Sequence, residues 1–170
     1  MDNVDFGLLV LRIAMGFTIM AHGWNHLFGG GRLPGTALWF ESMGMKPGWL
    51  QARLATATEF GAGVLIVLGL FTPLGAAGVI GLMIVAIVVA HRRNGFFVFR
   101  PGQGWEYCAF LAAAAFTLGA IGAGSVSLDN AFGIGVDNWW GAVVAGIIGP
   151  LGAFLLLAVS YRPPARAAKG

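Results

Sequence analysis

The sequence predicts an all-α membrane protein, a polytopic helix bundle, and three observations support this fold class. Of its 170 residues, 58% are hydrophobic and only 10% are charged, whereas soluble domains carry about 25% charged residues. The mean hydropathy is +0.80. Long stretches almost free of Asp, Glu, Lys and Arg recur along the chain, each close to the roughly 20 residues that a membrane-spanning helix needs. This composition excludes an ordinary soluble domain.

Five segments have the length and composition of membrane spans, namely residues 6–28, 50–70, 74–90, 106–124 and 138–161. The first follows acidic Asp2 and Asp5 rather than the basic residues of a signal peptide, so we expect it to be retained. The second and third are separated at Phe71-Thr72-Pro73, because proline can begin a helix but is poorly tolerated inside one. The loop 29–49 is long enough for a short helix in the headgroup region.

The last two spans show features of helix packing and of interfacial anchoring. Small residues, which allow helices to approach closely in a membrane, recur at every fourth position, at Ala115, Gly119 and Ala123 and again at Gly141, Ala145 and Gly149. The fifth span has tryptophans at one end and Tyr161 at the other, as expected of aromatic anchors. We therefore expect both segments to pack closely against neighbouring helices.

The positive charges predict the orientation of the chain in the plasma membrane. With five spans, the N-terminus, the 71–73 turn and the 125–138 loop share one side, which holds no Lys or Arg. The other side holds Arg32, Lys46, Arg92, Arg93, Arg100, Arg162, Arg166 and Lys169, with Arg53 at its edge. The positive-inside rule then places the N-terminus outside and the C-terminus in the cytoplasm. Ten cations spread along such a chain are too sparse for a nucleic-acid-binding face.

Ionisable residues within the predicted spans are the candidates for function, since each costs at least about 2.5 to 3.5 kcal/mol at the centre of a span. Arg12, His22 and His26 lie within about 80° of one another on the first helix, so this face is expected to meet other helices. Glu59 lies in the middle of the second span, and Arg12 is the cation expected to reach it. Two interpretations stay open, a buried ion pair that sets helix register and a proton carrier or ligand to a quinone or cofactor.

A second group of polar residues is expected near the cytoplasmic ends of the spans. His22, His91 and Glu106 fall at similar depth there and would bind a metal, relay protons or hydrogen-bond a quinone carbonyl. His26 and His91, considered singly, are also typical of interfacial residues. The spacing of His22 and His26 lacks the glutamate of a hydrolytic zinc motif, so no metal site is predicted. His22 and His91 are the residues that would ligate a metal if one were bound. Cys108 has no partner cysteine and is expected to be a small buried hydrophobe.

Over roughly residues 6–130 the sequence resembles the DoxX family of small bacterial membrane proteins. The residues that carry the resemblance are Leu11-Arg12, Ala21-His22-Gly23, Ala57-Thr58-Glu59-Phe60-Gly61-Ala62-Gly63, Leu68-Gly69-Leu70-Phe71-Thr72-Pro73, His91, Glu106, Gly122-x-Gly124 and Ser127-Leu128-Asp129. The resemblance implies a four-helix membrane domain over residues 1–130. This sequence adds a fifth span within 131–161 and a basic cytoplasmic tail at 162–170.

The resemblance also implies a function. DoxX-family proteins are linked to terminal quinol oxidase and thiosulfate:quinone oxidoreductase subunits and to membrane assemblies involved in oxidative stress. We therefore expect an accessory subunit of an oxidoreductase complex rather than a stand-alone enzyme, because the sequence has no flavin, dinucleotide or iron–sulfur motif. Its intramembrane cluster of polar residues would bind a small apolar ligand such as a quinone and exchange protons with it. The cluster consists of Arg12, His22, Glu59, His91 and Glu106.

Two other hypotheses stay open. In the first, the protein is structural or serves assembly, its polar cluster only stabilises the bundle, and its surfaces recruit other membrane redox proteins. In the second, it binds haem or a metal through His22 and His91. Each places the chain in the lipid bilayer, and each leaves the ligand and the oligomeric state open.

Overall fold

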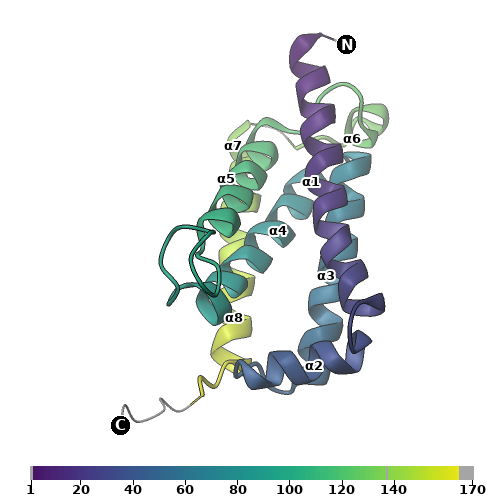
Figure 1. Ribbon diagram of the computed structural model, residues 1–170. Helices are drawn as coiled ribbons and strands as arrows, with labels where there is room; N and C mark the ends of the chain where they lie inside the picture. Colours follow the sequence, from purple (N-terminus) through teal and green to yellow (C-terminus); the bar gives the residue numbers. More distant parts are fainter. Residues whose placement is uncertain (1, 137, 165–170) are drawn as a thin grey trace.

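The computed structural model describes residues 2–136 and 138–164, and its regular elements are helices. They are α1 (Asn3–Phe28), α2 (Arg32–Ser42), α3 (Gly48–Leu68), α4 (Thr72–Ala86), η1 (Ile87–His91), α5 (Glu106–Ile121), α6 (Leu128–Phe132), α7 (Asn138–Val143), η2 (Val144–Ile148) and α8 (Gly149–Ser160). The π-helical turn η1 continues α4, and η2 joins α7 to α8. The described chain therefore forms five long helical rods and two shorter helices (Figure 1).

The predicted all-α membrane fold is confirmed. Three helical rods, Asn3–Phe28, Thr72–His91 and Trp139–Ser160, are long and apolar enough to cross a membrane. Helix α5 is apolar but only 16 residues long, and α3 is 21 residues long but contains Arg53 and Glu59. The division into four spans plus a fifth therefore remains a prediction. Of the predicted basic tail, Arg166 and Lys169 lie outside the described residues.

The two ends of the bundle hold different segments of the chain. At one end the backbone amide of Ser125 donates to Asp5 of α1 at 2.7 Å, and the backbone amide of Asp129 donates to the carbonyl of Gly69 at 2.8 Å. At the other end α2 lies across the ends of α1 and α3, near the end of α8 (Figure 1). The predicted short helix in the 29–49 loop is therefore present as α2.

Close packing of α1 on α3 depends on two glycines. A Cβ atom placed on Gly63 would lie 2.8 Å from the carbonyl oxygen of Gly16 and 2.5 Å from the Cγ atom of Met20. Such distances are shorter than van der Waals contact, so the two helices can approach this closely only without side chains at the crossing. The crossing brings the polar face of α1 against α3.

The predicted small-residue runs lie between helices, as expected. A Cβ atom on Gly119 would lie 2.8 Å from the Cβ of Ala145 and 3.0 Å from the Cβ of Ala76. One on Gly149 would lie 2.7 Å from the carbonyl oxygen of Ala77. These residues therefore pack the C-terminal rod against both α5 and α4, and Ala76 and Ala145 are fully buried.

The α1–α3 crossing can be tested with two glycines that lie two residues apart on α3. We expect Gly63→Ala to lower the free energy of unfolding by about 1 to 3 kcal/mol, as overpacking does, because its methyl group would meet the backbone of α1. Thermal unfolding in detergent measures the change.

The matched control is Gly61→Ala, whose added methyl group would have no atom within 4 Å. It should leave the unfolding temperature unchanged or raise it, since alanine favours a helix over glycine by up to about 1 kcal/mol. Equal stability of the two variants would contradict the packing role of Gly63.

Candidate functional site

Arg12 is buried near one end of the bundle, and its guanidinium donates hydrogen bonds to backbone carbonyl oxygens. It is 1% exposed. Its guanidinium donates four hydrogen bonds, from Nε to Ile66 (2.9 Å), from Nη2 to Val67 (2.8 Å), and from Nη1 to Ala123 (2.8 Å) and Val126 (2.7 Å). These carbonyls belong to the last turn of α3 and to the segment after α5. Arg12 therefore ties α1 to two segments distant in the sequence.

The turn between α3 and α4 is shaped around this arginine. Gly69 has a φ of +60°, and a Cβ atom there would lie 2.6 Å from Cζ of Arg12, so only glycine fits. The carboxylate of Asp129 accepts from the backbone amides of Phe71 (2.7 Å) and Thr72 (3.0 Å) and from the Thr72 hydroxyl (2.7 Å). Asp129 thus supplies acceptors for the first amides of α4, which have no partner within the helix.

The predicted ion pair between Arg12 and Glu59 is wrong. Arg12 lies level with Ile66, seven residues further along α3 than Glu59, which corresponds to a rise of about 10 Å. Its donors are used by carbonyls at a helix C-terminus, where the helix dipole also favours a cation. Arg12 is therefore a structural residue in this fold and does not reach the centre of α3.

Glu59 lies instead beside His26. Its Oε2 atom is 2.9 Å from Nδ1 of His26, and the residue is 9% exposed. Oε2 is shielded from solvent, and this contact does not count as a hydrogen bond, so Oε2 has no hydrogen-bond partner within the described chain. His26 was interpreted from the sequence as interfacial. One sequence signal pointed to its contact with α3: His26 lies four residues after His22, on the face of the first helix that also carries Arg12.

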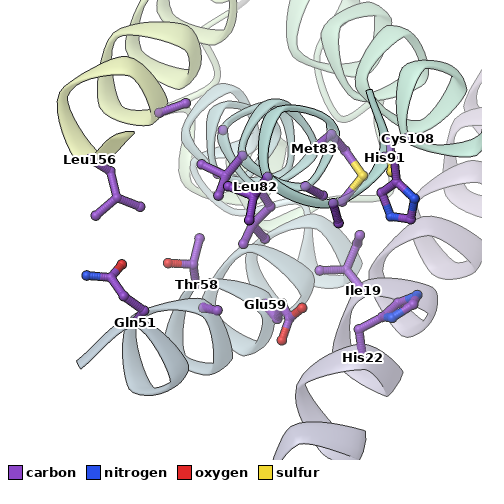
Figure 2. Close-up of a pocket in the computed structure, with 18 of the residues that line it drawn as sticks. Ile19, His22, Gln51, Thr58, Glu59, Leu82, Met83, His91, Cys108 and Leu156 are labelled. Atoms are coloured by element: carbon purple, nitrogen blue, oxygen red, sulfur yellow. The ribbon is translucent and has the colours of Figure 1, made fainter. Parts of the chain in front are cut away.

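A cavity of about 1020 Å³ lies between α1, α3, α4 and α8, and Glu59 is part of its wall. Its surface is mainly apolar, with many small and aliphatic residues from α4, η1 and α8. Figure 2 shows Gln51, Thr58 and Glu59 along α3, facing Leu82 and Met83 of α4. The polar side chains therefore enter a space that is otherwise hydrophobic.

The five predicted site residues do not all meet. His22, Glu59 and His91 line the cavity, and Figure 2 shows the two histidines on the same side of it. His22 is exposed, which places it at the opening. Glu106 does not line the cavity. Its Oε2 accepts from the backbone amide of Val98 at 3.0 Å and holds the loop before α5. Arg12 is also outside the cavity.

The geometry gives no support to a metal centre. Among residues 2–136 and 138–164, no three His, Cys, Asp or Glu side chains gather as metal ligands would. The Nδ1 atom of His91 is already 2.9 Å from the carbonyl oxygen of Gln103. Cys108 is buried and lines the cavity.

The fold and the site therefore define a helical membrane protein with a largely apolar cavity and a buried carboxyl group in its wall. The DoxX family model matches residues 7–92, which is half of the chain, and the protein belongs to the DoxX family. The match includes Arg12, His22, His26, Glu59 and His91, and it ends before Glu106. No curated protein and no solved structure matches the chain.

The structural role of Arg12 predicts a large effect of its removal. We expect Arg12→Met to lower the free energy of unfolding by about 2 to 4 kcal/mol, because four carbonyls lose their charged donor, a loss partly offset by no longer burying the guanidinium charge. Thermal unfolding in detergent measures this loss.

Arg53→Met is the matched control, since Arg53 is exposed and donates only to the carbonyl of Trp49 in its own helix. This variant should differ little from the natural protein. If Arg12→Met were equally mild, the four hydrogen bonds would not carry the stability assigned to them.

Proposed function

We propose that this DoxX-family membrane protein binds a small, largely apolar molecule with a polar ring, such as a quinone, in the cavity between α1, α3, α4 and α8. The observation that supports this proposal is the Glu59 carboxyl group, which is buried in the cavity wall and whose Oε2 has no hydrogen-bond partner within the described chain. Buried polar groups are nearly always hydrogen-bonded, and the exceptions call for an explanation. A bound molecule would supply the missing partner.

The size and chemistry of the cavity favour such a ligand. Small-molecule sites commonly measure about 300 to 1,000 Å³ and combine apolar walls with a few placed polar groups. The cavity, at about 1020 Å³, has this composition. A lipid-soluble molecule would reach it from the bilayer without crossing water.

The alternative, that the polar residues only stabilise the bundle, accounts for one part of them. Arg12, Asp129 and Glu106 bind backbone groups and close turns or tie helices together. Glu59 binds no backbone group, and its contact with His26 at 2.9 Å leaves Oε2 without a hydrogen bond within the described chain. The alternative therefore fits the first group and leaves the cavity group unexplained, which favours ligand binding.

We further propose that the protein acts as an accessory subunit beside a redox partner in the plasma membrane, since the chain has no motif for an electron carrier of its own. The lysine and arginine pattern supports an outer N-terminus and a cytoplasmic C-terminus. On this interpretation residues 1–130 form the four-helix domain and 131–161 the added span. The small-residue surface that joins α5 to the C-terminal rod supports treating the added span as part of the same bundle.

Filling the cavity should block binding. Ala55 lines the cavity, and we expect Ala55→Phe to weaken binding of a short-tailed benzoquinone, supplied in its oxidised and reduced forms, by at least about tenfold, or 1.4 kcal/mol. Calorimetric titration of the purified protein in lipid nanodiscs measures the affinity.

Ala57→Phe is the control, because Ala57 is exposed on α3 and does not line the cavity. It should bind as the natural protein does. Undiminished affinity in Ala55→Phe, or no binding by the natural protein, would refute the proposed site.

A further inference from the structure

We propose that the loop formed by residues 92–105, between η1 and α5, inserts into the surface of the bilayer and binds anionic phospholipids there. This proposal goes beyond the ligand of the cavity and does not depend on it. Three properties of the loop support it. The loop is folded against itself, it exposes phenylalanine rings, and it exposes arginines beside them.

The position of the loop makes lipid its neighbour. It follows directly on the rod Thr72–His91, which is long and apolar enough to cross a membrane. Figure 1 shows the loop just before α5, at the side of the bundle rather than beyond α2. A segment at the side of a membrane-embedded bundle, next to the end of a span, borders the headgroups and the acyl chains beneath them.

Hydrogen bonds within the loop give it a fixed shape. The side-chain amide of Asn94 donates across the loop to the carbonyls of Gly102 (2.6 Å) and Gln103 (3.0 Å). The backbone amide of Glu106 donates to the carbonyl of Phe96 at 2.9 Å. Backbone groups that are paired within the protein can lie against lipid, because they do not need water as a partner. The loop is therefore suited to contact the bilayer.

Two phenylalanine rings form the apolar part of the surface. The rings of Phe97 and Phe99 stack, with their centroids 5.2 Å apart and their planes at 18°. Phe99 is 79% exposed and Phe97 is 43% exposed. Phe96, in contrast, packs its ring edge-on against Trp105. Exposed apolar residues that adjoin one another mark a contact surface, so Phe97 and Phe99 are the side chains available to acyl chains.

Three arginines form the charged part of the surface. Arg92, Arg93 and Arg100 are all exposed, and residues 92–105 include no Asp or Glu. Within the described chain none of the three lies within salt-bridge distance of a carboxylate. The guanidinium carbon of Arg100 lies 6.0 Å from the centre of the Phe97 ring. The positive charge is thus next to the apolar rings, as a phospholipid's phosphate is next to its acyl chains.

This charge favours phospholipids with a net negative charge. A guanidinium pairs with two phosphate oxygens at once, and basic residues near a membrane surface are attracted by anionic lipids. In phosphatidylglycerol the phosphate charge is not compensated, whereas phosphatidylcholine has a cation of its own that the arginines would repel. An acidic soluble protein could pair with the arginines, but it would leave Phe97 and Phe99 without an apolar partner.

Lipid binding to the natural full-length protein tests the proposal. We expect native mass spectrometry from a non-ionic detergent to show the first phosphatidylglycerol binding at least about fivefold more tightly than phosphatidylcholine with the same acyl chains. Glycerol 3-phosphate, which has the phosphate but no acyl chains, should bind at least about tenfold more weakly than phosphatidylglycerol.

Two triple variants with equal loss of charge locate the site. Replacing Arg92, Arg93 and Arg100 by Gln should reduce the preference for phosphatidylglycerol to about twofold or less, because the loop then has no cation. Replacing Arg32, Arg53 and Arg162 by Gln is the matched control. It removes three cations outside the loop and should keep the full preference.

Insertion of the rings is a second measurement. A nitroxide label is placed on Phe99→Cys or on Arg93→Cys, each combined with Cys108→Ala, in nanodiscs that contain phosphatidylglycerol. At position 99 the label should be relaxed more strongly by oxygen, which concentrates in the bilayer. At position 93 it should be relaxed more strongly by a water-soluble nickel complex.

The proposal is overturned if the natural protein binds the two lipids equally, or if the loop variant keeps its preference. Loss of preference in the control variant would also overturn it, because the attraction would then be spread over all cations. Glycerol 3-phosphate binding as tightly as the lipid would identify a phosphate site instead, and a nickel-accessible label at position 99 would contradict insertion.

Discussion

The structure depends on the hydrogen-bond acceptors that surround one buried guanidinium group, in a helix bundle that has few polar side chains. Arg12 donates to backbone carbonyls, two at the end of α3 and two in the segment after α5. Carbonyls at a helix C-terminus have no amide to bind within the helix. The last carbonyls of α3 therefore accept hydrogen bonds from Arg12, and Arg12 obtains acceptors for its buried donors. This single side chain holds α1 to segments more than 50 and more than 110 residues further along the chain.

The contrast between Arg12 and Glu59 supports the proposed division of the buried polar residues into structural and ligand-binding ones. Both side chains are ionisable, buried and on helices that pack together, yet Arg12 has four hydrogen bonds and Oε2 of Glu59 has none within the described chain. An unpaired buried polar group costs about 1 to 3 kcal/mol or more. Evolution tolerates such a cost chiefly at functional sites, and the open space beside Glu59 is where a ligand would remove it.

The positions of the helices could be predicted from the sequence because a membrane span has a one-dimensional signature of length and hydropathy. The pairing of side chains could not, since it depends on how far each helix is rotated and shifted against its neighbour. Arg12 shows the difficulty, because carbonyl partners have no signature in the sequence. His26 and Glu59 meet where α1 lies close to α3 at Gly23, on which a Cβ atom would lie 3.2 Å from the Cβ of Glu59.

The cavity exists because the bundle is tied at both ends and left unfilled between them. At one end Arg12 and Asp129 join the helices, while at the other the amide of Lys46 donates to the carbonyl of Ser160 (2.8 Å) and that of Arg162 to Gly44 (2.7 Å). These bonds fasten the end of α8 to the loop between α2 and α3. Small residues of α4 and α8 then form much of one wall, beside larger aliphatic side chains of the same helices. The DoxX family match covers residues 7–92, which include Glu59 but not α8. A segment outside the match therefore completes a cavity whose buried carboxyl group belongs to the matched part.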